Sequence, residues 1–406
     1  MTAATSPQPV PFVRRVRIHN YRSIANCDVT LGPLTVLVGF NASGKTNFLD
    51  ALRLVTEALE LSPAQAVESR GGLESLLHRS PTGTAESFGI WLDLTLPVHE
   101  IRSLVTARYG FEIGHDPAGE ATLLVKREVG EVDLPDGTVS LQLDTPAPQS
   151  RLRLSAIVVD RNSLEAALER RLMSMRFHDF STTALAALNK SKRAHSLGSA
   201  GEHLGRVLER IKQIEPLAKE RLDAYLSALV PGALGMDERM EGLYSTVQAR
   251  FQAGEDTGRP ADDSEGFEVF LREELSEGTL RAAGVLAALL QVPVLRGLVA
   301  LVGIEEPEKA LHPAGVGALY EALDDASQHT QVIVTSQSSD LLDNEYARPE
   351  HLRVVSNVDG ATRVGEIDAS GRAILNKGLM TLAELHRSGQ LRPDTVGHER
   401  DAGEAA

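Results

Sequence analysis

The segment at residues 39–46, Gly-Phe-Asn-Ala-Ser-Gly-Lys-Thr, constrains this chain more than any other part of it. Its spacing is that of a phosphate-binding loop, in which the two glycines allow backbone dihedrals that a β-carbon forbids. The apolar run at 34–38 predicts a buried strand before the loop, and the apolar spacing of 47–55 predicts a helix after it. The plain alternative is an ordinary glycine turn before a helix, which this context disfavours.

Each part of the loop has an expected role. Successive N–H groups curl around phosphate oxygens, and the helix opening at Lys45 points its positive dipole end at the same anion. We expect Lys45 to bridge the β- and γ-phosphates and the Thr46 hydroxyl to hold Mg²⁺. The remaining nucleotide-binding residues expected here are Gly39, Asn41, Ala42, Ser43, Gly44 and Asn47. The sequence therefore predicts a site for ATP with Mg²⁺.

Composition limits the fold and the compartment. A chain of 406 residues with 42% apolar content can form two or three lobes. Its one cysteine, Cys27, rules out an internal disulfide framework and suits a reducing compartment. Residues 1–11 are polar and proline-rich, without an apolar signal core. We expect a soluble cytoplasmic protein.

One apolar segment, residues 282–304, is long enough to span a bilayer. It contains Gln291, Pro293 and Arg296 and runs directly into two glutamates. A helix followed by a buried strand explains it better than a membrane span, so we expect no membrane partner.

The net charge of −15 argues against a surface broadly adapted to nucleic acid. Basic islands at 14–17, 161–176 and 190–193 leave local patches open. For each island alone, a solvated face or helix ion pairs is the favoured interpretation.

A second informative region lies far downstream. The apolar run at 298–304 predicts a strand that ends in Glu305-Glu306-Pro307-Glu308. Open α/β sheets bind ligands at the carboxyl ends of their strands. We therefore expect Glu305 to hold Mg²⁺, and Glu306 to orient and deprotonate the water that attacks the γ-phosphate. Acidic residues after a strand also form ordinary turns, but the phosphate loop upstream favours catalysis.

A third motif, Leu-Ser-Glu-Gly at 275–278, precedes a predicted helix at 280–290. The Ser276 hydroxyl, the Gly278 amide and a helix N-terminus make a second candidate anion site. The plain alternative is a helix cap. A phosphate already held by the first loop has no obvious need for this site, unless it serves another subunit.

Together these motifs, followed by Leu311-His312-Pro313 and the strand at 331–336, resemble the ABC-type ATPase heads of the RecF, SMC and Rad50 group. More narrowly, they resemble the stand-alone predicted AAA ATPases of the AAA_21 type. The segment at 16–24 is similar to the first strand of those heads, and the resemblance covers most of residues 12–370.

The resemblance implies an α/β fold: a P-loop ABC-ATPase head with a mixed central sheet, an antiparallel β subdomain and a short helical insertion in place of a coiled coil. It also implies a homodimer in which two heads meet head to tail around two Mg-ATP. Ser276 and Gly278 would then act in trans, Arg22 would reach the bound nucleotide, and the loop at 308–313 would communicate across the dimer. Nucleotide would hold the dimer together and hydrolysis would loosen it.

Two features depart from the family pattern. The family usually has a histidine after the strand at 331–336, where this chain has Gln337. A glutamine amide can donate a hydrogen bond but cannot shuttle a proton, so we expect slow hydrolysis. The family's glutamine before the helical lobe is unassigned, because Gln142 and Gln149 are only roughly nearby and 155–162 contains none.

The predicted organisation has four segments. Residues 1–160 form an N-terminal ATPase lobe whose part from 88 to about 158 alternates apolar and polar residues, as antiparallel strands do. Residues 161–235 are a helical insertion, and 236–388 form the C-terminal ATPase lobe, with a hairpin around Asp359-Gly360. Residues 389–406 read as a disordered tail.

Three functional hypotheses follow. The first is an ATP-dependent dimerising switch whose output a neighbouring effector protein reads. The second is a DNA-maintenance or anti-phage module of RecF-like character that closes over duplex DNA. The third, a small-molecule kinase sharing only the phosphate loop, is disfavoured by the motifs at 275–278 and 305–308.

Overall fold

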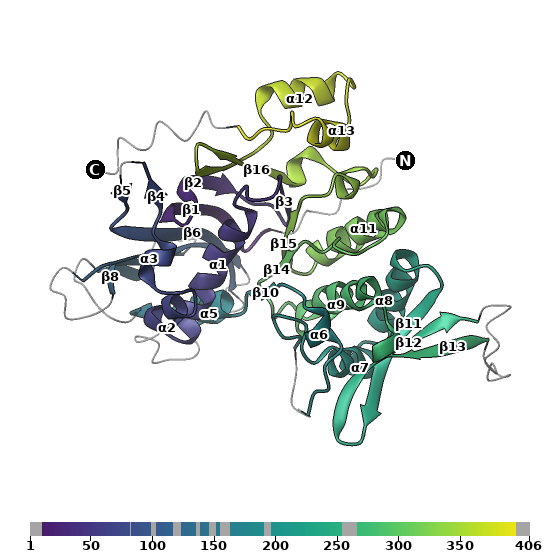
Figure 1. Ribbon diagram of the computed structural model, residues 1–406. Coiled ribbons are helices and arrows are strands. Elements are labelled where there is room, and N and C mark those ends of the chain that lie inside the picture. Colours follow the sequence, from purple (N-terminus) through teal and green to yellow (C-terminus); the bar gives the residue numbers. More distant parts are fainter. Residues whose placement is uncertain are drawn as a thin grey trace. The chain divides into compact units, whose positions relative to one another are not determined.

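The computed structural model describes residues 10–81, 83–98, 103–116, 123–134, 139–145, 152–154, 163–190, 196–253 and 266–394. The chain divides into two compact units (Figure 1). Unit 1 comprises Met1–Met175 and Arg348–Ala406, and unit 2 comprises Arg176–Ala347. The sequence placed boundaries at 160, 235 and 388 instead. The difference arises because residues beyond 347 return to pair with a strand of the first unit.

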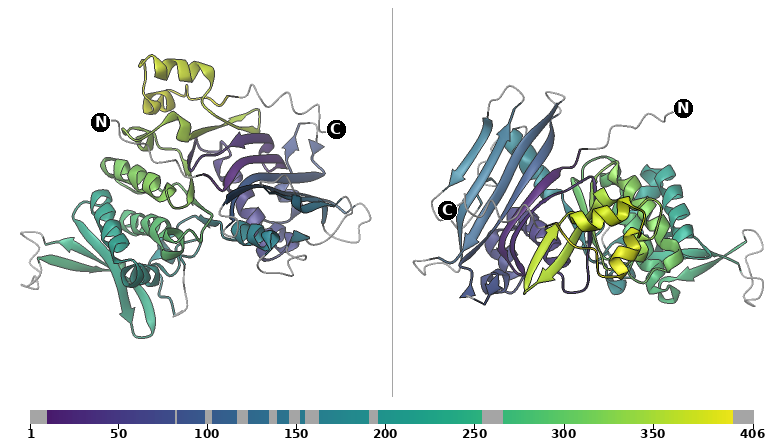
Figure 2. Two further views of the ribbon diagram at one scale, coloured as in Figure 1. Left: turned by 180° about the vertical axis from the view of Figure 1, so that it is seen from behind. Right: turned by 90° about the horizontal axis from the view of Figure 1, so that it is seen from above.

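Unit 1 contains a six-stranded antiparallel sheet, whose strands lie side by side in the right panel of Figure 2. On its first strand the apolar side chains of Val16 and Ile18 are fully buried while Arg15 and Arg17 are not, as expected for a sheet with one covered face. In spatial order the strands are β2 (Ile24–Thr30), β1 (Val13–Tyr21), β6 (Ser87–Val98), β7 (Ser103–Gly114), β8 (Leu124–Asp133) and β9 (Val139–Thr145). The strands β6 to β9 of this sheet confirm the antiparallel strands that the sequence predicts after residue 88.

A second set of strands in unit 1 carries the phosphate loop. The strand β3 (Leu34–Val38) is buried along its whole length and runs parallel to β16 (Leu352–Val358). A hairpin joins β16 to β17 (Ala361–Gly365), and Asp359 and Gly360 both have positive φ at its turn. The predicted hairpin at these two residues is confirmed.

Helices and short elements complete unit 1. The helix after the loop, α1 (Lys45–Glu60), buries an apolar face, and its Thr56 hydroxyl donates to the Leu172 carbonyl of α5 (Leu164–Met173). The others are α2 (Pro63–Glu68), α3 (Leu73–Leu76), β4 (Arg79–Ser80), β5 (Gly83–Thr84), η4 (Pro349–His351), α12 (Ala369–Asn376) and α13 (Leu382–Arg387).

The end of the described chain differs from expectation. The sequence predicted disorder from residue 389, whereas residues 389–394 pack on unit 1. Leu391 is buried, Pro393 forms a β-bridge with Ile367, and the Asp394 N–H donates to the Glu366 carbonyl at 2.7 Å. One apolar anchor and main-chain pairing outweigh the polar composition here. The remainder of the predicted tail, 395–406, lies outside the described residues.

Unit 2 has a parallel core. The strands β10 (Arg176–His178), β14 (Leu301–Glu305) and β15 (Gln331–Ser336) run parallel in that order. The helix α9 (Glu277–Leu290) is buried from Thr279 to its end and is followed by α10 (Val292–Leu295). The stretch Glu277–Leu295 is long and apolar enough to cross a membrane, but 83% of its most apolar part is buried inside the fold. This matches the expected helix and buried strand.

The remaining elements of unit 2 include the insertion. Its helices α6 (Thr182–Leu185), α7 (Leu204–Ile214) and α8 (Pro216–Leu229) are short, as predicted. A three-stranded antiparallel sheet then follows, which the sequence analysis did not identify. It consists of β11 (Ala233–Glu241), β12 (Tyr244–Gln252) and β13 (Phe267–Leu271); η1 (Arg272–Glu274), η2 (Pro313–Gly315), α11 (Val316–Ser327) and η3 (Asp340–Leu342) complete the unit.

Candidate nucleotide site

The phosphate loop lies between β3 and α1 in unit 1, as the sequence predicts. Gly44 has φ of 104°, and a β-carbon there would lie 2.0 Å from Thr362 Oγ1. A β-carbon on Gly39 would lie 2.1 Å from the Val355 carbonyl oxygen. Both positions therefore require glycine, one for its backbone conformation and both for space.

The loop surrounds its lysine. Lys45 is only 6% exposed, and its Nζ donates to the carbonyls of Gly39 at 2.7 Å and Phe40 at 2.9 Å. Asn41 and Thr46 are exposed at the same loop and at the start of α1. The Lys45 ammonium, the Thr46 hydroxyl and the N-terminus of α1 thus lie together. A nucleoside triphosphate requires the cation and the helix N-terminus, and its Mg²⁺ requires the hydroxyl.

A chain of hydrogen bonds connects the phosphate loop and the start of α1 to β17. Asn47 Nδ2 donates to Ser23 Oγ at 2.7 Å, Ser23 Oγ lies 2.7 Å from Thr362 Oγ1, and Thr362 Oγ1 donates to the Ser43 carbonyl at 2.9 Å. The order of donors is self-consistent, since each hydroxyl has one hydrogen to give. Asn47, predicted to bind nucleotide, therefore has a structural partner in Ser23. Sequence reasoning missed Thr362, which is too distant in the chain for any local pattern to reveal.

Arg22 lies beside α1. Its Nη2 is 3.1 Å from Asp50 Oδ2, and Asp50 also accepts from Tyr21 Oη at 2.6 Å and Arg70 Nε at 2.9 Å. Burial, reinforced by Asp50, raises the pKa of the Tyr21 hydroxyl far above its usual range, so this residue acts as a donor. Asp50 follows Thr46 by one helical turn, so its ion pair with Arg22 places that arginine beside the beginning of α1, directly after the phosphate loop.

The predicted catalytic carboxylate is in unit 2, where the chain leaves β14. Glu306 has φ of 44°, a conformation that costs a residue with a side chain about 1–3 kcal/mol. Its N–H donates to Thr335 O at 3.2 Å and Oγ1 at 3.1 Å. Its carbonyl accepts from Lys309 N at 3.0 Å and from Arg281 Nη2 at 3.4 Å. The backbone of Glu306 is therefore held on both sides.

Arg281 is a second residue that sequence reasoning missed. It lies on α9, is 3% exposed, and also donates through Nη1 to the Phe180 carbonyl at 2.6 Å. The short bond to Phe180 holds the buried guanidinium in place, and the longer bond of 3.4 Å reaches the Glu306 carbonyl. An arginine inside an otherwise apolar helix was the available sequence signal.

Glu308 is buried near the carboxylate of Glu306. It is 8% exposed, and it accepts a hydrogen bond from Ser336 Oγ at 2.6 Å and another from the Gln337 N–H. Burial raises the pKa of Glu308 above its usual value, while these donors act in the opposite direction. The Gln337 side chain is exposed at the end of β15. Because β14 and β15 are parallel neighbours, Glu305, Glu306 and Gln337 share one edge of unit 2.

The third motif begins α9. Ser276 Oγ accepts from the Thr279 N–H at 3.1 Å, so the serine caps the helix, and it remains exposed. A β-carbon on Gly278 would lie 2.4 Å from the Ala310 carbonyl oxygen. The helix start therefore packs closely on the loop at 308–313. In that loop His312 caps η2 by accepting from the Ala314 N–H at 3.2 Å, which agrees with its expected role as a loop residue.

Few side chains that could bind a metal ion lie together in the described part of the chain. Within the part of the chain that the structure describes, no cluster of three or more His, Cys, Asp or Glu side chains could hold a metal ion. Mg²⁺ commonly binds through one or two protein ligands, several waters and substrate phosphates. The Thr46 hydroxyl in unit 1 and the Glu305 carboxylate in unit 2 are each a type of oxygen ligand that binds Mg²⁺.

The basic island at 14–17 lies on the open face of the antiparallel sheet. Arg15 pairs with Asp28, and Arg17 with Asp93 at 3.0 Å. Trp91 lies over Gly89 and Gly110 in a groove of about 610 Å³ on this face. Most of the island at 190–193 lies outside the described residues.

Comparisons with known proteins agree on the fold type. Residues 34–343 match the model of the AAA_21 family, described as "AAA domain, putative AbiEii toxin, Type IV TA system". The DNA replication and repair protein RecF of Gloeobacter violaceus is 47% identical over 45 residues, 11% of this chain and 12% of that protein. The OLD nuclease of Thermus scotoductus is 32% identical over 87 residues, 20% of this chain and 16% of that protein. Each match thus covers less than a fifth of the relative's length.

A solved structure shows the fold at greater length. The SMC head bound to the C-winged helix domain of ScpA superimposes with a TM-score of 0.55 and 16% identity, covering 89% of this chain and 99% of that one. The likeness supports the α/β head architecture with its antiparallel β subdomain.

Proposed function

The chain belongs to the AAA_21 family and has the ABC-type ATPase head of the RecF, SMC and Rad50 type, and from this premise we propose that it hydrolyses ATP to ADP and phosphate. The observation that carries the proposal is the loop closed around Lys45, whose Nζ is held by two loop carbonyls. The held backbone of Glu306 supports the hydrolytic step.

In unit 1 the loop binds the triphosphate. Backbone N–H groups of 39–46 receive the phosphate oxygens, and Lys45 turns toward the β- and γ-phosphates in place of its two carbonyls. Thr46 offers its exposed hydroxyl to Mg²⁺, and Arg22 approaches from the β1–β2 turn. When bound, Mg²⁺ supplies positive charge that offsets the charge developing on the phosphates.

In unit 2 the carboxylates act on water. Glu306 accepts the proton of the attacking water, and its clamped backbone fixes the direction of its carboxylate. Glu305 contributes the carboxylate for Mg²⁺, and Gln337 donates a hydrogen bond without moving a proton. Turnover is therefore slow.

Two copies form the working unit in this proposal. Ser276 and Gly278 of one copy cover the γ-phosphate held by the other, which gives the exposed α9 N-terminus a ligand. ATP favours the closed dimer and hydrolysis releases it, so the protein is a switch that a neighbouring effector protein can read. The buried free Cys27 suits a reducing, cytoplasmic setting.

Two substitutions test the proposal. Lys45→Ala should abolish ATP binding, measured by titration with a fluorescent ATP analogue. Glu306→Gln should bind ATP and Mg²⁺ but form a stable dimer, measured by light scattering with and without nucleotide. A Glu306→Gln protein that stays monomeric at saturating ATP and Mg²⁺ would contradict the dimer.

The in-trans role has its own test. Ser276→Arg places a bulky side chain at an exposed helix cap, so the monomer should still bind ATP while pairing and turnover are lost. Normal hydrolysis by this variant would dispose of the assignment. Phosphate transfer to an acceptor other than water would instead favour a kinase.

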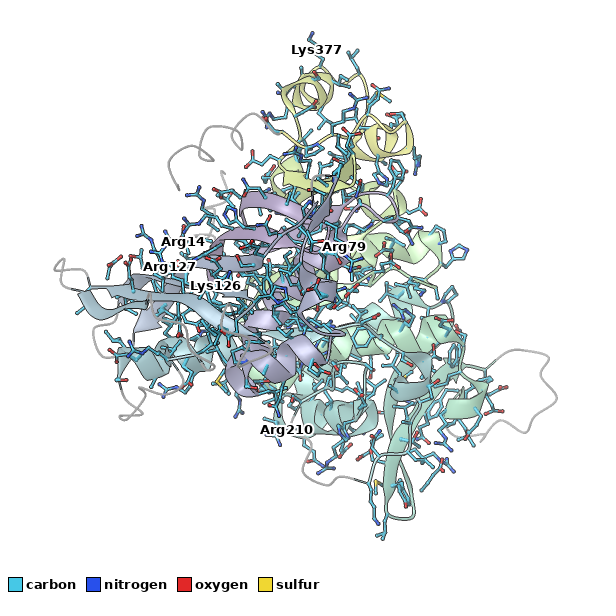
Figure 3. The ribbon with its side chains drawn as sticks, turned by 60° about the vertical axis from the view of Figure 1, so that its left-hand side comes forward. Arg14, Arg79, Lys126, Arg127, Arg210 and Lys377 are labelled. Atoms are coloured by element: carbon cyan, nitrogen blue, oxygen red, sulfur yellow. The ribbon has the colours of Figure 1, made fainter. Side chains whose placement is uncertain are left out.

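Duplex DNA is the second candidate partner. Arg14, Lys126 and Arg127, labelled in Figure 3, come from β1 and β8 of the sheet that carries the Trp91 groove. The ion pairs of Arg15 and Arg17 weigh against it, since phosphates would have to displace Asp28 and Asp93. If DNA is the partner, it should stimulate the ATPase strongly at low salt and little at moderate salt. An unchanged rate with DNA at low salt removes this candidate.

A further inference from the structure

A groove of about 490 Å³ opens beside the first half of the phosphate loop in unit 1. Gly39, Asn41 and Ser43 form its border with the loop. Arg363 of β17 and Arg392 of the C-terminal segment supply its charged side chains, and none of the described residues that line it is acidic.

The donors of this groove lack acceptors. Neither the Arg363 nor the Arg392 guanidinium has a hydrogen bond or an ion pair among the described residues, although Arg363 is half-buried. Ser43 is 4% exposed, and its hydroxyl likewise has no partner within the described part of the chain. Half-buried cations normally pair with carboxylates, and among the described residues none pairs with these, so the groove suits an anion.

An apolar side chain forms another part of the groove. Phe40 is 58% exposed and stacks on His386 with ring centroids 5.2 Å apart. Burial and the neighbouring Lys45 lower the pKa of His386, so the positive charge of the groove comes from its arginines. The groove therefore suits a protein segment with a carboxylate and some apolar surface better than a bare phosphate.

Unit 2 exposes a carboxylate that has no cation as a partner among the described residues. Glu277 lies between Ser276 and Gly278 at the start of α9, is exposed, and has no ion pair among the described residues. Beside a helix N-terminus that receives phosphate, a carboxylate repels the ligand unless a cation compensates it. Nearby, Glu273 pairs with Arg272 at 2.6 Å and Glu274 accepts from the Leu271 N–H at 2.9 Å, whereas Glu277 has neither kind of partner among the described residues.

We propose that Glu277 of one copy enters this groove of a second copy and pairs with Arg363 and Arg392. The inference rests on the head-to-tail dimer proposed above. In that dimer Ser276 and Gly278 face the phosphate loop of the other copy, and the groove shares four residues with that loop. The pairing removes the repulsion between Glu277 and the triphosphate and steers the two heads into register.

Charge reversal tests the pairing in the Glu306→Gln protein with ATP and Mg²⁺. Glu277→Arg and Arg363→Glu should each weaken dimerisation at least about tenfold, measured by analytical ultracentrifugation, because each puts like charges together. The two changes combined in one chain should restore part of the association, since position 277 then again faces one opposite charge at position 363, while Arg392 stays positive. The dimer of the parent should weaken with added salt more than that of Glu277→Gln.

A matched control separates the pairing from net charge. Lys377, which Figure 3 shows projecting from the end of unit 1 at α12, lies outside the groove, so Lys377→Glu should dimerise like the parent. Thermal unfolding and fluorescent-ATP titration of each variant confirm folding and nucleotide binding, with Arg363→Gln as the milder substitution.

The outcomes distinguish the two proposals. If the Glu306→Gln parent does not dimerise with ATP, the dimer itself fails. If the parent dimerises but the single reversals match it, or the combined variant does not recover, the groove pairing is overturned while the dimer stands. An effect of Lys377→Glu equal to that of Arg363→Glu would also overturn it.

Discussion

The guanidinium of Arg281 donates to the carbonyl oxygen of Glu306 across 3.4 Å, and this bond joins α9, which Ser276 caps, to the residue that follows β14. The same guanidinium donates through Nη1 to the Phe180 carbonyl at 2.6 Å, so both of its terminal nitrogens are bonded to main-chain carbonyls. Any shift of α9 is therefore transmitted to the backbone that aims the Glu306 carboxylate. Within unit 2 this hydrogen bond links the helix that Ser276 caps to the residue proposed as the catalytic base.

Replacing Arg281 with methionine should lower kcat about tenfold to a hundredfold, because a carboxylate misplaced by about 1 Å loses that much. ATP affinity should stay near the parental value, since the phosphate loop belongs to unit 1. Steady-state kinetics and nucleotide titration measure the two quantities. Arg281→Lys, which keeps one donor, should lie between the parent and Arg281→Met. A folded Arg281→Met protein with parental kcat would refute the coupling.

Thr362→Val should weaken ATP binding about fivefold. It removes the hydroxyl that donates to the Ser43 carbonyl and relays the bond from Ser23, and one buried hydrogen bond contributes about 1 kcal/mol. Isothermal titration with a non-hydrolysable ATP analogue measures the loss. Thr362→Ser keeps the hydroxyl and should bind as the parent does; equal weakening in both variants would point to packing instead.

Gln337→His should raise turnover and add a limb near pH 6.5 to the rate profile, because an imidazole titrates there and can move a proton. The parent should show no such limb. Initial rates between pH 5.5 and 8.5 measure the difference, with Gln337→Ala as the control for the lost amide. A rate and profile unchanged by the histidine would remove Gln337 from the reaction.

Glu308→Gln should stabilise the protein increasingly as pH rises. Burial raises the pKa of Glu308, so its stabilising contribution is full below the ordinary glutamate pKa and is lost as pH climbs through the raised value. A neutral amide keeps an oxygen to accept from Ser336 and escapes that loss. The Tm difference between variant and parent should be larger at pH 8 than at pH 5. A difference independent of pH would contradict the assigned cause.

Sequence reasoning succeeded where the determinants are local. The loop at 39–46, the strand before it and the antiparallel strands after residue 88 follow from spacing and alternation alone, and the structure confirms them. It failed where a partner distant in the chain decides. The order at 389–394 depends on Leu391 and on main-chain pairing of Pro393 and Asp394, which no local composition predicts.

The sequence by itself determined the chemistry: two glycines, a lysine and a threonine that can receive a triphosphate, and two glutamates after an apolar strand. Only the tertiary structure decided what supports them. Thr362 lies beneath Gly44, and Arg281 holds Glu306, because folding brings together residues that are 318 and 25 positions apart and so invisible to each other in a linear pattern. Motifs are contiguous because phosphate binding needs adjacent N–H groups, whereas the positioning of a motif depends on whatever surface packs behind it.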